Sequence, residues 1–182
     1  MKPGIMNILT KNQRDKIERI KSSLENKKKL SKEEAGILIM AFGAEINYLS
    51  KMVENSLECN KEAEDLKKEL VEEQPTNKFI NLQIEIIDNR TQHINTEKGY
   101  VDNLKINYKM VKENPTIELF KLLKEKVDLV TEFQEQRMEY FYEAGEVVAA
   151  FGIRERDDMQ ASCLKRLDRV SKISEKIKSY EL

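Results

Sequence analysis

Seven acidic residues recur at helical spacing between residues 125 and 146, and they are the side chains of this chain best placed for metal or ion-pair chemistry. Their successive steps of 3, 4, 3, 4, 4 and 3 residues put them on one face of a helix. Helical bundles build di-metal centres from such carboxylates together with Glu-x-x-His pairs. The acidic stripe consists of Glu125, Asp128, Glu132, Glu135, Glu139, Glu143 and Glu146.

The only histidine does not complete such a metal site. Arg90, not a glutamate, lies three residues before His93. His93 is next to Ile94 and near Glu97, so we interpret it as a residue at the edge of an apolar seam. One His and two Cys are also too few for a Cys/His zinc cluster. We therefore expect no metal site and no cofactor.

A second stripe, of basic residues, follows near the C-terminus and repeats the helical spacing. The basic stripe consists of Lys165, Arg169, Lys172 and Lys176. One interpretation is that both stripes are solvated outer faces of helices. The other is that they set the register between helices or subunits, as flanking charges do in coiled coils. On this second interpretation the two stripes are our candidate partner-binding residues.

Motifs of the common enzyme classes do not occur in the sequence. There is no Gly-rich phosphate loop, no Gly-x-Ser-x-Gly and no arrangement of Ser, His and Asp typical of a hydrolase. We expect no catalytic residues and no small-molecule substrate. Cys59 and Cys163 fall at core-like places on predicted helices, which favours free buried thiols and a cytoplasmic location, and leaves a disulfide open as the alternative.

The elements that carry these residues are predicted to be long helices. Only Pro3, Pro75 and Pro115 interrupt the chain, and Ser31 with Glu34 forms a capping-box sequence. We predict an all-α fold of long antiparallel helices that form an elongated helical bundle or coiled-coil-like assembly. A flexible segment 1–9 would precede a single domain 10–182, with helices at about 10–28, 32–72, 77–113 and 116–180 and a kink or break near 152–158.

Apolar residues recur in heptads along these predicted helices. The seam in the 116–180 segment predicts that Phe141 is buried, and the seam over 35–70 predicts the same for Leu49, Cys59 and Leu66. Residues 80–86 also alternate like a strand, but a lone strand has no partner in a helical chain. No apolar run approaches the roughly 18–20 residues of a membrane span.

Charge is unevenly distributed although the net charge is −1. Residues 1–30 hold nine Lys/Arg and three Asp/Glu, whereas residues 31–75 hold five and eleven. We expect Ile17, Ile20 and Leu24 to dock on the apolar face of 37–57. The alternative is that they insert at the boundary of an anionic membrane, helped by the basic residues around them.

A short stretch resembles the second long helix of sorting-nexin-type BAR domains. The shared residues are Tyr140, Val147, Ala149-Ala150-Phe151, Arg154 and Gln160. The resemblance covers less than a sixth of the chain and implies a peripheral membrane protein. The chain departs from that family in its middle predicted helix, which is only about 40 residues long.

The expected function is a non-catalytic interaction or scaffold module that binds a protein helix or its own second copy, so that homo-oligomers are expected. Membrane-surface binding through the basic ends is the alternative. We do not expect nucleic-acid binding, because the chain is slightly acidic and no aromatic residue alternates with the basic ones.

Overall fold

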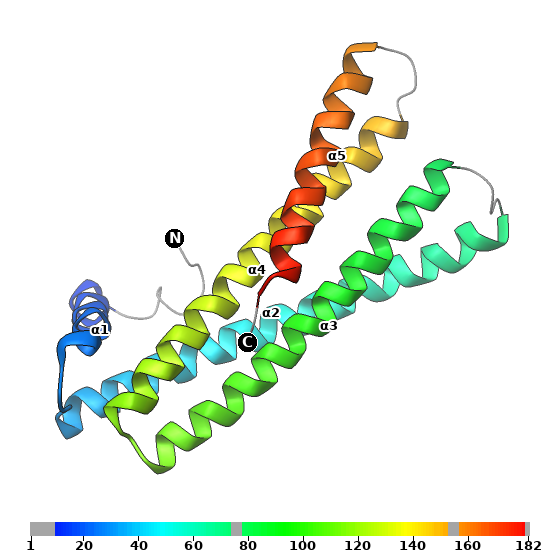
Figure 1. Ribbon diagram of the computed structural model, residues 1–182. Helices are drawn as coiled ribbons and strands as arrows, with labels where there is room; N and C mark the ends of the chain where they lie inside the picture. The colour runs from blue at the N-terminus through cyan, green and yellow to red at the C-terminus, as the bar shows by residue number, and fades with distance from the viewer. Residues whose placement is uncertain (1–9, 74–77, 153–156, 181–182) are drawn as a thin grey trace. The chain divides into compact units, whose positions relative to one another are not determined.

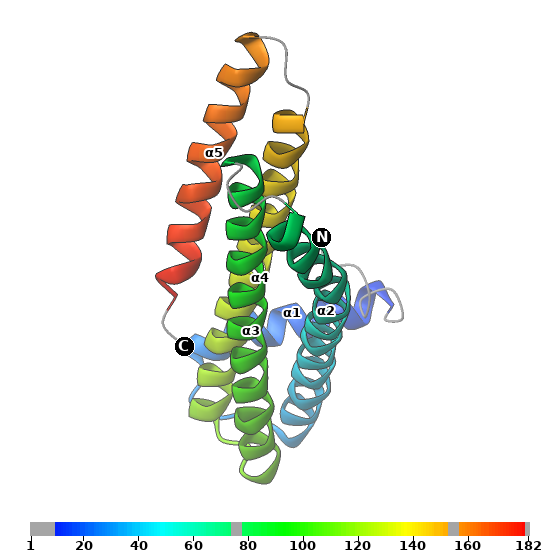
Figure 2. The same ribbon diagram turned by 90° about the vertical axis from the view of Figure 1, so that its right-hand side faces the viewer.

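The computed structural model describes residues 10–73, 78–152 and 157–180, and every regular element in them is helical (Figure 1). The all-α prediction is therefore confirmed. Figure 2 shows the same helices from the side, with α2 antiparallel to α3 and α4 antiparallel to α5. The elements are α1 Lys11–Ser23, the 3-10 turn η1 Leu24–Asn26, α2 Lys32–Glu73, α3 Lys78–Glu113, α4 Ile117–Gly152 and α5 Asp157–Lys178.

Capping residues account for the starts of α1 and α2. Ser31 Oγ accepts a hydrogen bond from the Glu34 amide (3.2 Å), and the Glu34 carboxylate accepts one from the Ser31 amide (3.0 Å), so the predicted capping box is confirmed. Thr10 and Gln13 form the same motif at α1. Each box satisfies backbone donors that the first helical turn leaves unpaired.

Two expectations of the sequence fall partly or wholly outside the described residues. Segment 1–9 lies outside them. For the break near 152–158, α4 ends at Gly152 and α5 begins at Asp157, while residues 153–156 are not described.

The helix predicted over 10–28 ends at Ser23 and continues only as the turn η1.

The described residues pack as two compact units, and the three long helices contribute to both. Unit 1 comprises the described residues of 1–53 and 98–131, and unit 2 those of 54–97 and 132–181. The expectation of a single domain over 10–182 stays a prediction.

Unit 1 has a predominantly apolar core. Phe42 of α2 and Phe120 of α4 are buried with their ring centroids 6.4 Å apart, and Leu49 is buried as predicted. The other buried apolar residues are Ile20, Leu24, Leu38, Ile46, Val53, Val101, Leu104, Val111, Ile117, Leu123, Val127 and Val130. Burial of such side chains stabilises a fold by about 1.5–3 kcal/mol each.

The basic helix α1 docks against the first half of α2. Ile20 and Leu24 are buried, and Ile17 is half-buried. Lys21 Nζ lies 2.6 Å from the Glu45 carboxylate and 4.8 Å from the centre of the Phe42 ring. These contacts are the docking arrangement that the sequence predicts.

A close approach between α2 and α3 depends on Gly43. The Tyr108 hydroxyl donates a hydrogen bond to the Ile39 carbonyl over 3.0 Å, which brings the phenol against Gly43. A Cβ atom at position 43 would lie 2.9 Å from Tyr108 Cζ, closer than Cβ atoms come to other atoms. The absence of a side chain at Gly43 therefore lets Tyr108 reach the α2 backbone.

Unit 2 shows three predicted core positions to be wrong. Phe141 is half-buried, because Tyr140 takes the core position and the seam is shifted by one residue in this part of α4. Cys59 and Leu66 are exposed. The second half of α2 meets α3 through a neighbouring face, where Asn60 and Lys67 bind α3, so the predicted seam residues point elsewhere.

Helix α2 is long and apolar enough to cross a membrane by length and composition, which the sequence analysis did not anticipate. Its apolar residues Leu38, Phe42, Ile46, Leu49 and Val53 form part of the core of unit 1. A helix in the core of a soluble protein meets the same criterion, and 33% of the apolar stretch of α2 is buried among the residues that the structure describes.

Candidate functional site

Unit 2 contains a buried group of polar side chains contributed by α2, α3 and α4. Arg137 and Glu97 are both completely buried and form an ion pair. Gln134 Nε2 donates a hydrogen bond to Glu97 Oε1 over 2.9 Å, and Arg137 Nη2 donates one to Ser56 Oγ over 3.0 Å. We call Ser56, Glu97, Gln134 and Arg137, together with His93, the polar cluster.

Burial governs the electrostatics of the ion pair. It raises the pKa of the Glu97 carboxyl above its ordinary value, against the attraction of Arg137 and the hydrogen bonds from Arg137 and Gln134. It also lowers the pKa of Arg137, against the attraction of Glu97. Each charge is thus stabilised mainly by the other, and loss of one partner would leave a charge buried in a medium of low polarity.

His93 is buried beside this ion pair. Its exposed fraction is 2%, and neither ring nitrogen has a hydrogen-bond partner among the described residues. Its ring meets the Tyr140 ring edge-on, with centroids 5.1 Å apart. Burial, with smaller contributions from Lys178 and Arg137, lowers the pKa of His93 to about 4, so the imidazole is neutral at pH 7. The sequence placed His93 only at the edge of the seam.

A second polar contact joins α2 to α3. Asn60 Nδ2 donates a hydrogen bond to Thr91 Oγ1 over 2.8 Å, and the Thr91 hydroxyl is also bonded to the Glu64 carboxylate. Asn60 is 5% exposed, and its Oδ1 has no hydrogen-bond partner among the described residues. The contact between these helices is therefore polar and retains one unsatisfied acceptor.

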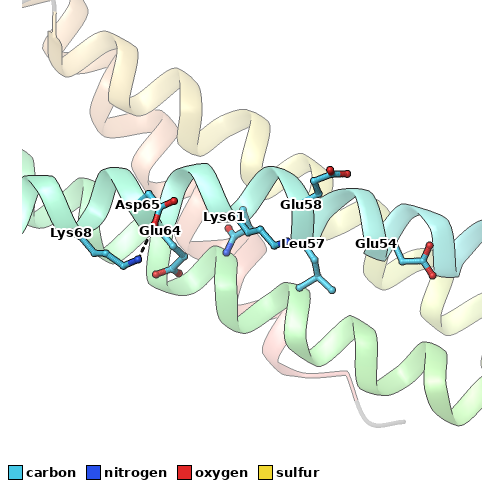
Figure 3. A pocket seen from close by; sticks show the side chains of 8 residues that line it. Glu54, Leu57, Glu58, Lys61, Glu64, Asp65 and Lys68 are labelled. Carbon is cyan, nitrogen blue, oxygen red and sulfur yellow. Dashed lines mark hydrogen bonds and ion pairs between the residues drawn. The ribbon is translucent and has the colours of Figure 1, made fainter.

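A groove of about 820 Å³ runs along the second half of α2 (Figure 3). Asn60 is part of its wall. Apart from Leu57 and Asn60, its lining side chains are charged, four acidic and two basic. They are Glu54, Glu58, Lys61, Glu64, Asp65 and Lys68. We refer to it as the α2 groove.

A smaller cavity, of about 280 Å³, lies between α3, α4 and α5. Its walls combine apolar residues such as Leu82, Val147 and Leu167 with the polar side chains of Asn89 and Ser174. Tyr140 also lines it, and burial raises the pKa of its hydroxyl to about 12. The phenol therefore stays protonated at neutral pH and can serve as a hydrogen-bond donor.

The structure brings much of the acidic stripe of α4 together with basic residues of α5. Glu132 lies 3.0 Å from Lys176, and Arg169 pairs with both Glu139 and Glu143, at 3.1 Å in the second case. Glu146 pairs with Arg166, which was not among the predicted residues (3.2 Å). These pairs hold α5 along α4. They are the contacts expected if the two stripes set the register between helices.

The remaining stripe residues are not brought together. Glu125 and Asp128 belong to unit 1, where Asp128 pairs with Lys124 at 3.0 Å. Lys172 pairs with Asp168 of its own helix at 2.6 Å. Glu135 and Lys165 are exposed. No group of three or more potential ligands that could hold a metal ion occurs in the part of the chain that the structure describes.

The polar cluster is the feature that sequence reasoning missed. Its signal in the sequence is the occurrence of polar residues at seam positions, Gln134 and Arg137 on α4 and Ser56 on α2, where they interrupt an apolar pattern. Glu97 occupies the gap between Ile94 and Val101 in the α3 seam. When polar residues interrupt the apolar seams of several helices, the pattern indicates that these residues contact one another in the core.

Comparison with known proteins finds no family model, no curated protein and no solved structure that matches this chain.

Proposed function

We propose that the protein is a non-catalytic interaction or scaffold module that binds through helix–helix contacts, with a protein helix or a second copy of the chain as its partner. The observation that carries this proposal is an exposed apolar stripe on the outer face of α4 in unit 2. Met138 and Tyr142 have exposed fractions of 45% and 69%, although both are large apolar side chains.

The residues around this pair continue the stripe at the spacing of a coiled-coil seam. Met138, Tyr142, Gly145 and Ala149 are separated by steps of 4, 3 and 4, and all four are exposed. The space around Gly145 is open for at least 4 Å beyond a Cβ position. A second helix could therefore approach this end of α4 closely, while its side chains pack around Met138 and Tyr142.

Burial of the two large side chains would provide the main attraction. Each contributes roughly 1.5–3 kcal/mol when it is fully removed from water. That is enough for a weak contact, and the stripe would work together with other surfaces of the molecule. Homo-oligomer formation belongs to this proposal.

Membrane-surface binding, the alternative, receives less support from unit 1. Ile20 and Leu24 belong to the core and are not presented to a lipid surface. Lys16, Lys21 and Lys27 pair with Glu33, Glu45 and Glu34 of α2. These three lysines are therefore neutralised by carboxylates of the same unit.

Sedimentation velocity over a range of concentrations tests the proposal. We expect the wild-type chain to associate, and the double variant Met138→Ser with Tyr142→Ser to shift towards the monomer. The matched control is Met40→Ser on α2, whose side chain is also 69% exposed. Association that is unchanged in the double variant would remove the α4 stripe as the contact surface.

Co-sedimentation with vesicles of mixed neutral and anionic lipid separates the alternative. Vesicle binding by the wild-type chain that is lost when α1 is deleted, with no self-association in solution, would support the membrane-surface function instead.

A further inference from the structure

The α2 groove presents alternating charges to its surroundings. Glu58, Lys61, Asp65 and Lys68 are exposed and follow each other in steps of 3, 4 and 3, so they share one helix face with the order minus, plus, minus, plus. In Figure 3 the labelled side chains project from α2 along this stretch. Lys68 pairs with Asp65 of the same helix over 2.8 Å, so an occupant of the groove should carry charges opposite to those of Glu58, Lys61 and Asp65.

A buried acceptor adds a requirement for hydrogen-bond donors. Asn60 lines the groove, its side chain is 5% exposed, and Oδ1 has no partner among the described residues. A buried acceptor without a partner destabilises the folded chain, so a donor supplied by an occupant would relieve that cost if the Asn60 side chain turned its Oδ1 towards the groove. Lysine and arginine side chains are the donors that also suit Glu58 and Asp65.

The chain itself contains a helix with the complementary order. On α1, Lys11, Asp15 and Arg19 are exposed and separated by steps of 4, which places them on one face with the order plus, minus, plus. This face points away from the docked side of α1, where Ile20 and Leu24 are buried. None of the three forms an ion pair with the residues that the structure describes.

We infer that the α2 groove of one copy binds the outer face of α1 of a second copy. Lys11, Asp15 and Arg19 would meet Glu58, Lys61 and Asp65, and the match holds in either direction because both orders are symmetric about their central residue. The groove residues 54–68 and helix α1 each extend for about 20 Å at 1.5 Å per residue, so their lengths also agree. This inference rests on the proposed function and names its partner.

The contact is expected to depend strongly on salt. Exposed ion pairs contribute little individually and are screened within about 8–10 Å at physiological ionic strength. Three matched pairs therefore provide mainly specificity, while burial of Leu57 adds to affinity. Self-association through the groove should weaken steadily from low to high NaCl.

Charge reversal with a mixing experiment tests the inference. One variant carries Glu58→Lys and Asp65→Lys, and the other carries Lys11→Glu and Arg19→Glu; all four positions are exposed, and circular dichroism checks that both variants remain helical. We expect each variant alone to associate about tenfold more weakly than the wild type, as loss of complementary charge does at other interfaces. An equimolar mixture should recover association, because in a mixed pair the two reversed surfaces are complementary to each other and the two unchanged surfaces still match.

The matched controls are Glu113→Lys with Glu118→Lys, and Lys98→Glu with Lys109→Glu, which make the same changes of net charge at exposed positions outside both surfaces. Association lowered equally by the controls would show a general charge effect and overturn the inference. The inference also fails if both variants sediment like the wild type, or if mixing restores nothing. Wild-type association that survives the reversals but is lost in Met138→Ser with Tyr142→Ser would leave the proposed function standing without the groove contact.

Discussion

The cores of the two units differ in how many polar side chains they bury. Of the nine buried polar or charged residues in the described part of the chain, seven lie in unit 2 and only Lys21 and Ser50 lie in unit 1. Unit 1 combines an apolar core with the close approach of Tyr108 to Gly43. Unit 2 contains a completely buried ion pair, Arg137 with Glu97, in addition to its buried apolar residues.

The difference in core composition affects the stability of unit 1 and the alignment of the helices in unit 2. Apolar burial stabilises without much directional preference, so unit 1 resembles an ordinary bundle core. A buried ion pair adds little net stability over an apolar core, but it penalises every arrangement of the helices in which its members are unpaired. We therefore interpret the polar cluster as the part of unit 2 that fixes the alignment of α2, α3 and α4.

The largest expected effect comes from breaking the ion pair on one side. Arg137→Met should lower the free energy of unfolding by about 3–5 kcal/mol, because it leaves Glu97 buried without its partner. Urea denaturation followed by circular dichroism measures this. The double variant Arg137→Met with Glu97→Leu should recover most of the loss, and a double variant as unstable as the single one would contradict the pairing.

A core truncation in unit 1 provides the comparison. Leu49 is 2% exposed, and Leu49→Ala should lower the free energy of unfolding by about 2–5 kcal/mol through lost burial and a residual cavity. A second truncation in the same core, Phe42→Ala, should add to the loss, whereas Glu97→Leu rescues Arg137→Met. A loss below about half a kcal/mol would mean that this position is not core.

The free energy of unfolding should depend on pH through the protonation of His93. Its pKa is lowered to about 4 in the folded chain, against an ordinary value of 6.5, so on acidification the unfolded chain takes up the proton first. Its contribution to stability is therefore complete above about pH 7 and is lost as the pH falls from 6.5 to 4, by about 3 kcal/mol at 1.36 kcal/mol per pH unit.

The matched variant is His93→Phe, which keeps an aromatic ring and cannot be protonated. The difference in unfolding free energy between wild type and variant, measured by urea denaturation across the acidic and neutral range, should vary with pH only below the ordinary pKa of histidine. A constant difference would show that His93 does not titrate as a buried imidazole.

The smallest effect is expected for the contacts between α4 and α5. Glu139 and Arg169 are partly exposed, so a double-mutant cycle with Glu139→Gln and Arg169→Gln should give a coupling energy of about 0.2–1 kcal/mol that declines with added NaCl. Glu143 is more buried, and its coupling to Arg169 should persist to higher salt. Equal couplings with no salt dependence would contradict ion pairing.

Most of the helical architecture could be predicted from the sequence, because caps and apolar spacing are local properties. Ser31 and Glu34 lie within one turn of each other, and their hydrogen bonds follow from that spacing. Leu49 lies in a wide apolar face, so its burial did not depend on the exact partner.

The candidate sites could not be predicted to the same extent, because they depend on which helices meet at which level. The burial of Arg137 requires Glu97, a residue 40 positions earlier, to lie opposite it. The shift from Phe141 to Tyr140 arises in the same region, where Arg90 and Arg137 lie over the Phe141 ring at 5.0 Å. A heptad pattern read from one helix contains no information about such contacts.

The contact between Gly43 and Tyr108 has a consequence for how this chain can change in evolution. As long as position 108 carries a tyrosine whose hydroxyl binds the Ile39 carbonyl, position 43 has no room for a Cβ atom. A larger residue at 43 requires the phenol of Tyr108 to move off the α2 backbone, and a shorter side chain at 108 removes the conflict. In any set of homologous sequences, these two positions, 65 residues apart, should therefore change together.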